Sequence, residues 1–183
     1  MKRCGWCGNE EIYVAYHDTE WGKPVHDDRL LFEMLILEGF QAGLSWLTVL
    51  KKRSAFKAAF DDFDVAKVAA YDEQKVAQLL QNAQIIRSRQ KICAAIQNAK
   101  VFMAIQREFG SFAEYLWHWS EHKIMRYGIF PPPAENALSQ KIAQDLKKRG
   151  MKYTGSVIIY AYLQAVGVID DHEPECFLHK ARD

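Results

Sequence analysis

The sequence predicts an all-α protein. Apolar residues recur at the three- and four-residue spacing of an amphipathic helix over most of the chain, and serine or aspartate precedes several of these stretches, as helix caps do. No segment shows the sustained alternation that half-buried strands need. The chain has 183 residues, of which 49% are hydrophobic and 26% charged, which suits one globular domain or two closely packed helical lobes.

The first strongly patterned helix is predicted to begin at Asp28, which can cap it. Its apolar face is formed by Leu31, Met34 and Leu35. Glu38 falls on the same spacing, although a carboxylate there is costly to bury without a partner. Gly39 is expected to end the helix, and residues 41–44 are expected to form a turn.

The middle of the chain is predicted to hold several more helices. Ser45 can cap a helix that ends near Phe60, and Asp64 and Asp72 can begin two short ones. A long amphipathic helix is expected over residues 88–107. Because the connection that precedes it is short, a hairpin between two helices is predicted near residues 82–91.

The C-terminal part is also predicted to be helical. Ser111 with Glu114 matches a capping box, and a further helix should cover residues 138–150. Residues 156–167 are ambiguous because their first turn is rich in β-branched side chains. A lone strand would have nothing to pair with, so a helix is predicted there. The proline run 131–133 indicates a surface loop.

Charge and hydropathy exclude two classes of protein. The net charge of +1 does not fit a histone or a basic tail, so basic residues that bind nucleic acid must be clustered. The longest apolar stretch, residues 157–169, is too short to span a membrane and contains Gln164. The first residues lack the apolar core of a signal peptide. We therefore expect a cytoplasmic protein without membrane segments.

The two chain ends carry cysteine and histidine at spacings that suit one metal ion. The four candidate ligands are Cys4, His17, His172 and Cys176. Two thiolates and two imidazoles fit tetrahedral zinc, and a closed set of four ligands would be structural. Spacing alone leaves free buried thiols as an equal alternative, and Cys7 or His179 could replace one ligand. Cys93, in the long helix, is expected to pack in the core.

Glu38 is accompanied by many aromatic residues in the N-terminal third of the chain. These are Trp6, Tyr13, Tyr16, Trp21 and Trp46. Aromatic faces attract cations, and a carboxylate accepts hydrogen bonds and complements positive charge. A flat cationic base with an exocyclic amine would satisfy both, and it would also be a good leaving group because it departs neutral. The competing interpretation is that Glu38 is simply exposed at a helix end.

Three clusters of basic residues are candidate phosphate contacts, at 51–53, 87–91 and 147–149. The middle cluster follows the predicted hairpin, and two helices joined by a tight turn can point backbone amides at a phosphate. A solvated helix face or a helix C-terminal cap is the competing interpretation for each cluster.

Many short segments, in one order, resemble the 3-methyladenine DNA glycosylase I family of the helix-hairpin-helix glycosylase superfamily. The segments are 3–6, 13–18, 20–22, 37–39, 41–46, 49–53, 85–87, 147–150 and 171–172. The resemblance covers almost the whole chain. It implies an all-α, helix-hairpin-helix glycosylase-like bundle, with a structural zinc ion that ties the N- and C-terminal segments together. The implied ligands are Cys4, His17, His172 and Cys176.

The resemblance also assigns roles to other residues. Glu38 would recognise the methylated adenine by a hydrogen bond, between the aromatic walls Tyr16 and Trp46. Three further aromatic residues would surround the pocket, namely Tyr13, Trp6 and Trp21. Gly43 and Leu44 would enter the gap left by the flipped nucleotide. Phosphate contacts are expected from Arg87, Lys147 and Arg149.

The implied activity is that of a monofunctional DNA glycosylase in base excision repair. It would flip out 3-methyladenine from alkylated double-stranded DNA, hydrolyse its N-glycosidic bond and release the free base. No lysine Schiff base forms in the family, and the catalytic aspartate usual in the superfamily is absent, so no general base is assigned. We expect a monomer.

We expect a single glycosylase unit over residues 1–183. Residues 28–130 would form a helical region that includes the hairpin, and residues 1–27 and 134–183 would combine as a zinc-stapled lobe. Relatives tend to carry glycine in the hairpin, where this chain has Gln84 and Gln90.

Two alternatives remain open from the sequence. One is a zinc-stapled domain that binds DNA or a purine without cutting. The other is a glycosylase with a different lesion preference, which hypoxanthine and 7-methylguanine substrates would reveal.

Overall fold

The computed structural model describes residues 1–180, and within this range it is all-helical, as predicted. The α-helices are α1 (Glu11–Thr19), α2 (Asp28–Gln41), α3 (Trp46–Lys51), α4 (Arg53–Ala59), α5 (Val65–Ala69), α6 (Glu73–Gln81), α7 (Arg89–Phe109), α8 (Phe112–His118), α9 (Ala137–Lys148) and α10 (Ser156–Ala165). Short 3₁₀ turns cover Gly5–Cys7 and Asp61–Phe63. In the described range, β pairing is limited to an isolated bridge between Met125 and Ile169.

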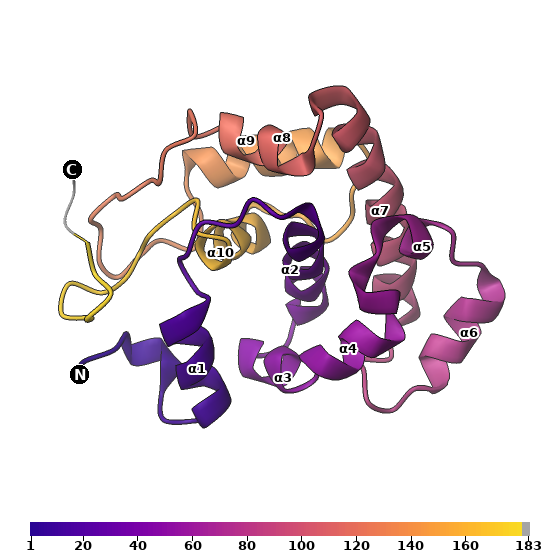
Figure 1. The fold of residues 1–183 in the computed structure, drawn as a ribbon, viewed down its shortest axis with the longest axis horizontal. Helices are drawn as coiled ribbons and strands as arrows, with labels where there is room; N and C mark the ends of the chain where they lie inside the picture. The colour runs from indigo at the N-terminus through magenta and orange to yellow at the C-terminus, as the bar shows by residue number, and fades with distance from the viewer. Residues whose placement is uncertain (181–183) are drawn as a thin grey trace.

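Helix α2 lies at the centre of the bundle, packed against α3, α7, α8 and α10 (Figure 1). The N-terminus and the last described residues, up to 180, lie at one end of the molecule, and α5, α6 and α7 lie at the opposite end (Figure 1). The chain ends therefore meet far from the connection between α6 and α7.

The sequence of α2 explains its central place. Nearly every residue from Leu31 to Phe40 is buried, so this helix is covered on all sides and not only along one stripe. Two of the buried residues, Glu33 and Glu38, are acids. Glu33 is paired: its Oε1 accepts a hydrogen bond of 2.6 Å from Arg53 Nε, and Arg53 also bonds Glu20 at 2.6 Å. The burial of Glu33 is thus compensated, whereas that of Glu38 requires a separate explanation.

Two predicted helix boundaries were wrong. Asp27, not Asp28, caps α2 by accepting from the backbone N–H of Leu30 at 2.8 Å. Asp28 instead accepts from the first backbone N–H groups of α8, those of Phe112 and Ala113. Helix α2 also continues past Gly39 to Gln41, since an isolated glycine is tolerated inside a helix.

The helix predicted over 45–60 is two helices. The helix break falls at Lys52, between α3 and α4. Helix α1 was not predicted at all, since its residues carry no clear apolar stripe. The expected caps are confirmed for Ser45, Asp64, Asp72 and Ser111. Ser88 also caps α7. The ambiguous segment at 156–167 contains α10, so its helical interpretation is confirmed.

Cys93 was expected to pack in the core, and this was wrong: it is exposed on α7. The buried stripe of α7 runs through its neighbours Ile92 and Ala94, and leaves Cys93 on the outer face. Among residues 1–180, no helix is both long and apolar enough to cross a membrane.

The ion pair between Arg53 and Glu33 gives a test of the fold. Arg53→Met would leave the Glu33 carboxylate buried without its partner, and this should lower the free energy of unfolding by roughly 3–5 kcal/mol. Lys57→Met is the matched control on the same helix, because the pair of Lys57 with Asp62 is exposed. The control should change stability by less than about 1 kcal/mol. Urea denaturation measures both, and equal effects would contradict the account.

Candidate active site

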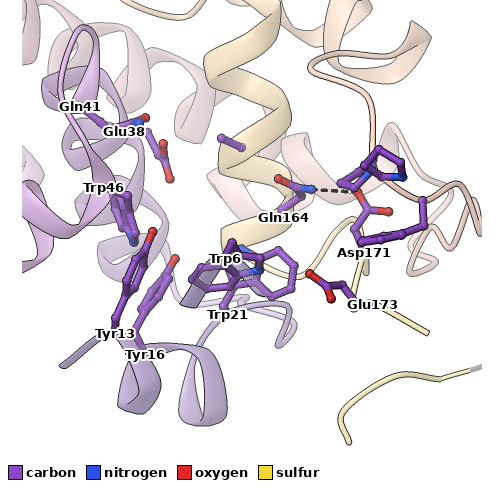
Figure 2. A pocket seen from close by; sticks show the side chains of 14 residues that line it. Trp6, Tyr13, Tyr16, Trp21, Glu38, Gln41, Trp46, Gln164, Asp171 and Glu173 are labelled. Atoms are coloured by element: carbon purple, nitrogen blue, oxygen red, sulfur yellow. Dashed lines mark hydrogen bonds between the residues drawn. The ribbon is translucent and has the colours of Figure 1, made fainter. Parts of the chain in front are cut away.

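A cavity of about 360 Å³ lies between α1, α2, α3 and α10 (Figure 2). Its aromatic lining includes the five predicted residues Trp6, Tyr13, Tyr16, Trp21 and Trp46, together with Phe130, which was not predicted. Its polar lining consists of Glu38, Gln41, Gln164, Asp171 and Glu173. The structure therefore brings together every residue predicted for the base pocket.

Glu38 projects into this cavity from the last turns of α2 (Figure 2). Its side chain is buried, with 4% of the residue exposed, and burial raises its pKa to about 8. Its Oε2 atom has no hydrogen-bond partner among residues 1–180. Such a carboxyl group gains from any ligand that offers an N–H donor or a positive charge.

Tyr16 and Trp46 form the wall beside Glu38. Their ring centroids are 5.6 Å apart with an interplanar angle of 50°. Figure 2 shows Tyr13, Tyr16 and Trp46 on the same side of the cavity as Glu38. Trp46 Nε1 is buried and lacks a partner in the described chain. This end of the cavity thus offers aromatic faces, one N–H donor and one carboxyl group.

Trp6 connects the cavity with the chain ends. Its ring lies 5.0 Å from that of Tyr13 and 4.9 Å from that of Trp21, both edge-on. The ring of Trp6 also lies 5.4 Å from that of His17. Trp21 in turn lies 4.7 Å from the ring of His172. One aromatic cluster therefore serves as cavity wall on one side and covers the predicted metal ligands on the other.

The opposite end of the cavity was not predicted from the sequence. There Asp171 Oδ2 accepts hydrogen bonds from Tyr160 Oη at 2.6 Å and from Gln164 Nε2 at 2.8 Å (Figure 2). Glu173 accepts from the backbone N–H of Gly5 at 2.7 Å. The loop at 130–132 also lines the cavity, so the proline run is more than a surface loop. These residues follow no periodic pattern that sequence reasoning could detect.

Three of the four predicted metal ligands meet at the chain ends. The donor atoms of Cys4, His17 and Cys176 all lie within 4.8 Å of one another, and all three residues are buried. His172 lies beside this group, with its ring centroid 5.4 Å from that of His17. Its Nε2 atom is buried and has no hydrogen-bond partner among the described residues.

Both histidines are oriented by carboxylates. His17 Nδ1 lies 2.8 Å from Asp18 Oδ1, and His172 Nδ1 lies 2.7 Å from Asp170 Oδ1. Arg3 donates to Asp18 and lowers the pKa of that carboxyl to about 2. An acceptor at Nδ1 keeps the proton there, which leaves each Nε2 free to ligate.

The two alternative ligands lie elsewhere. Cys7 is buried, but its sulfur contacts the carbonyl of Gly8 and is not part of the cluster. His179 Nδ1 lies 2.9 Å from the carbonyl of His172. The donor set, the buried Nε2 atom and the carboxylate partners all fit a zinc ion.

The turn between α2 and α3 presents an apolar side chain. Gly43 has a φ of +79°, which glycine adopts without strain. The turn is closed by hydrogen bonds from Leu44 N to the Gln41 carbonyl at 2.7 Å and from Gln41 Nε2 to the Leu44 carbonyl at 3.2 Å. Leu44 remains 41% exposed, so the tip of this turn presents an apolar side chain to solvent.

The connection between α6 and α7 forms a tight turn without glycine. None of the residues from 82 to 90 has a positive φ, so Gln84 occupies the turn without backbone strain. Gln90 lies in the first turn of α7. Asn82 supports the turn by accepting from the backbone N–H of Gln84 at 3.0 Å. The turn between α6 and α7 therefore needs no glycine in this chain.

The predicted phosphate contacts differ in their surroundings. Arg87 and Lys147 are exposed. Arg149 is held by hydrogen bonds of 2.6 Å to both Asp145 and Glu108. Its guanidinium is engaged within the protein, and the structure therefore favours a structural role for it.

Comparison with known proteins assigns the family. A family model described as methyladenine glycosylase matches residues 6–179. The DNA-3-methyladenine glycosylase 1 of Escherichia coli (strain K12) is 43% identical over 179 residues, which are 96% of each chain. A crystal structure of 3-methyladenine DNA glycosylase I is 44% identical, with a TM-score of 0.94 over 98% of this chain and 100% of that one. A further crystal structure, of a tyrosine-to-phenylalanine variant of 3-methyladenine DNA glycosylase I in complex with 3-methyladenine, is 33% identical, with a TM-score of 0.92 over 97% of each chain.

The fold and the site define an all-helical protein with an aromatic cavity built around a buried carboxyl group. With matches over nearly its whole length, the chain belongs to the methyladenine glycosylase family.

The burial of Glu38 predicts that this residue lowers the free energy of unfolding at neutral and alkaline pH. Its pKa is about 8 in the folded protein and 4.5 in the unfolded chain, so the folded state holds a proton that the unfolded state releases. Stability should therefore fall as pH rises from about 4.5 to about 8. Glu38→Gln removes this loss and should stabilise the protein at pH 8 by up to roughly 4–5 kcal/mol, since one pKa unit corresponds to about 1.4 kcal/mol.

Thermal unfolding of both proteins from pH 5 to pH 8 measures this difference. Glu11→Gln, which removes an exposed carboxylate of α1, is the control. A gain from Glu38→Gln that does not grow with pH would show that Glu38 is not buried as described.

Proposed function

We propose that this protein is a monofunctional DNA glycosylase that excises 3-methyladenine from alkylated DNA in base excision repair. The observation that carries the proposal is the Glu38 carboxyl group, buried without a partner beside the faces of Tyr16 and Trp46. A methylated adenine in DNA is flat, carries positive charge and has an exocyclic amine. Its positive charge and its N–H donor would compensate the buried Glu38 carboxyl group, which has no partner in the protein. Its positive charge would also be attracted by the faces of the neighbouring aromatic rings.

The reaction needs little acid catalysis, because the leaving base already carries a positive charge. The bond between N9 of the base and C1′ of the sugar breaks, and its electron pair leaves with the base, which departs neutral. Water adds to C1′ of the oxocarbenium-like sugar and loses one proton to solvent. The role of Glu38, Tyr16 and Trp46 is to bind the extruded base in its reactive orientation. Glu38 is thus a base-recognition residue, and we assign no general base.

The relatives support this choice of ligand. A solved relative is a complex with 3-methyladenine, and another concerns 3-methyladenine recognition by the enzyme from Staphylococcus aureus. The second of these is 32% identical, with a TM-score of 0.94. We propose that the same base occupies the Glu38 end of the cavity here, with Tyr13, Trp6 and Trp21 around it.

We further propose how the protein engages double-stranded DNA. The exposed Leu44, with Gly43 beside it, enters the gap left by the flipped nucleotide. The turn between α6 and α7, with the exposed Arg87, binds the phosphate backbone as a helix-hairpin-helix element. Lys147 is a further phosphate contact, and Arg149 supports its helix from within. The protein acts as a monomer and releases free 3-methyladenine.

We propose a structural zinc ion bound by Cys4, His17, His172 and Cys176. Bound there, zinc would tie residues 1–27 to residues 134–183 as one lobe, against the helical region 28–130. With four protein ligands it has no open coordination position. Its contribution to activity would be indirect, through the aromatic cluster that Trp6 and Trp21 form against the two histidines.

Glu38→Gln tests the role of the carboxylate. The substitution should lower kcat/KM on methylated DNA by roughly 10- to 100-fold, the cost of a lost hydrogen bond to a charged group. For the wild type, the carboxylate fraction grows with pH through about 8, so kcat/KM should rise from pH 6 to pH 9 and then level. The variant should show no such rise.

Release of 3-methyladenine from methylated DNA, corrected for spontaneous release, measures both effects. The control Glu11→Gln should match the wild type. Full activity of Glu38→Gln would rule out the proposed role of Glu38. Retention of methylated DNA without release by the wild type would indicate a binding module instead.

Two neighbouring cysteines give a matched test of the metal site. Cys4 and Cys7 are both buried and lie three residues apart, but only Cys4 belongs to the cluster. Protein purified without chelators should contain about one equivalent of zinc. Cys4→Ser should lose most of it and unfold at a lower temperature, whereas Cys7→Ser should retain it. Equal zinc content in the two variants, or less than about half an equivalent in the wild type, would contradict the assignment.

A further inference from the structure

Lys91 makes an unusual pair of hydrogen bonds at the end of α2. Its ammonium group donates to the carbonyl of Phe40 at 2.8 Å and to that of Ala42 at 2.5 Å. Ala42 directly precedes the turn formed by Gly43 and Leu44, and Phe40 lies in the last turn of α2. Lys91 itself lies in the first turn of α7, directly after the connection from α6. One side chain therefore bridges two segments that are about fifty residues apart in the sequence.

These bonds have a clear physical basis. The last carbonyls of a helix have no partner within the helix, and a cation near them is favourable. Lys91 is only partly exposed, and burial lowers its pKa, so its placement there has a cost. The cost is offset by two charge-assisted hydrogen bonds, which fix the end of α2 relative to the start of α7.

A second lysine, which follows Leu44 in the sequence, bonds the turn between α6 and α7. Lys52, at the junction of α3 and α4, donates to the carbonyl of Gln84 at 3.1 Å. Gln84 belongs to the turn between α6 and α7. The segment that carries Leu44 is thus anchored on both sides. Lys91, at the start of α7, bonds the carbonyls that precede Leu44, and Lys52, which follows Leu44, bonds the turn between α6 and α7.

We infer that Lys91 is a positioning residue for nucleotide flipping: it fixes the Gly43–Leu44 turn relative to the hairpin between α6 and α7. The inference rests on the proposed function. A phosphate held at the hairpin then determines where along the duplex Leu44 enters. If the two segments moved independently, the phosphate grip and the insertion of Leu44 would not act on the same nucleotide.

Lys91→Met tests this, because methionine keeps the apolar stem and removes the donors. The substrate is an oligonucleotide with a single adenine, methylated and annealed to a complement with either thymine or an abasic site opposite that adenine. Opposite thymine the base must be unpaired, and opposite an abasic site this cost is largely absent. The readout is the ratio of the rates of 3-methyladenine release from the two duplexes.

Lys91→Met should slow release from the paired duplex by at least about tenfold, since small misplacements are costly in catalysis. Release from the unpaired duplex should stay within about threefold of wild type, and so should the affinity for free 3-methyladenine, because neither depends on insertion. The variant should be no slower in the Leu44→Ala background than Leu44→Ala alone, as expected of residues that act as a unit. Lys100→Met, an exposed lysine of the same helix, is the control for lost charge.

The ratio does not depend on the fraction of folded enzyme, so lower stability of the variant does not obscure the result. A wild-type rate on the paired duplex, or an equal loss on both duplexes, would overturn the inference. A wild-type protein that releases no 3-methyladenine from either duplex would instead refute the proposed function.

Discussion

The rest of the site depends on one constraint, the burial of the Glu38 carboxyl group without a partner. The other buried acid of α2, Glu33, is paired with Arg53, so α2 could have been stabilised in the same way at Glu38. Instead the surroundings of Glu38 are aromatic, and its pKa is raised to about 8 by burial alone. A group in this state destabilises the free protein and is relieved by a cationic ligand. The same desolvation that costs stability therefore favours positively charged bases over neutral ones.

The two chain ends support the wall of the cavity that contains Glu38. Trp6 and Trp21 contact the cavity on one side and the histidines of the proposed zinc site on the other. The elements that we propose to contact DNA are joined in a comparable way, since Lys91 links the turn at Leu44 to the start of α7 and Lys52 bonds the connection between α6 and α7. The proposed sites for base recognition, insertion into the duplex and backbone contact would thus be connected through α2 and α7.

The sequence was sufficient for the fold class, for most helix caps and for the near end of the cavity. Helical periodicity and capping residues are local signals, and the aromatic residues around Glu38 lie in matched segments of a known family. The boundary at Asp28 failed because a tertiary contact decides it, since Asp28 accepts from the first backbone N–H groups of α8. The boundary at Gly39 failed because an isolated glycine is tolerated inside a helix. The far end of the cavity, at Asp171 and Gln164, could not be predicted, since its residues meet only through the packing of α10 against the C-terminal segment.

The central claim is that the Glu38 end of the cavity recognises the methylated adenine. A crystal structure of this protein with 3-methyladenine tests it most directly, because the cavity has two chemically different ends. We predict the base against Tyr16 and Trp46, with its exocyclic amine about 2.7–3.2 Å from a Glu38 carboxyl oxygen. A base bound at the Asp171 and Glu173 end, with Glu38 still unpaired, would contradict the account.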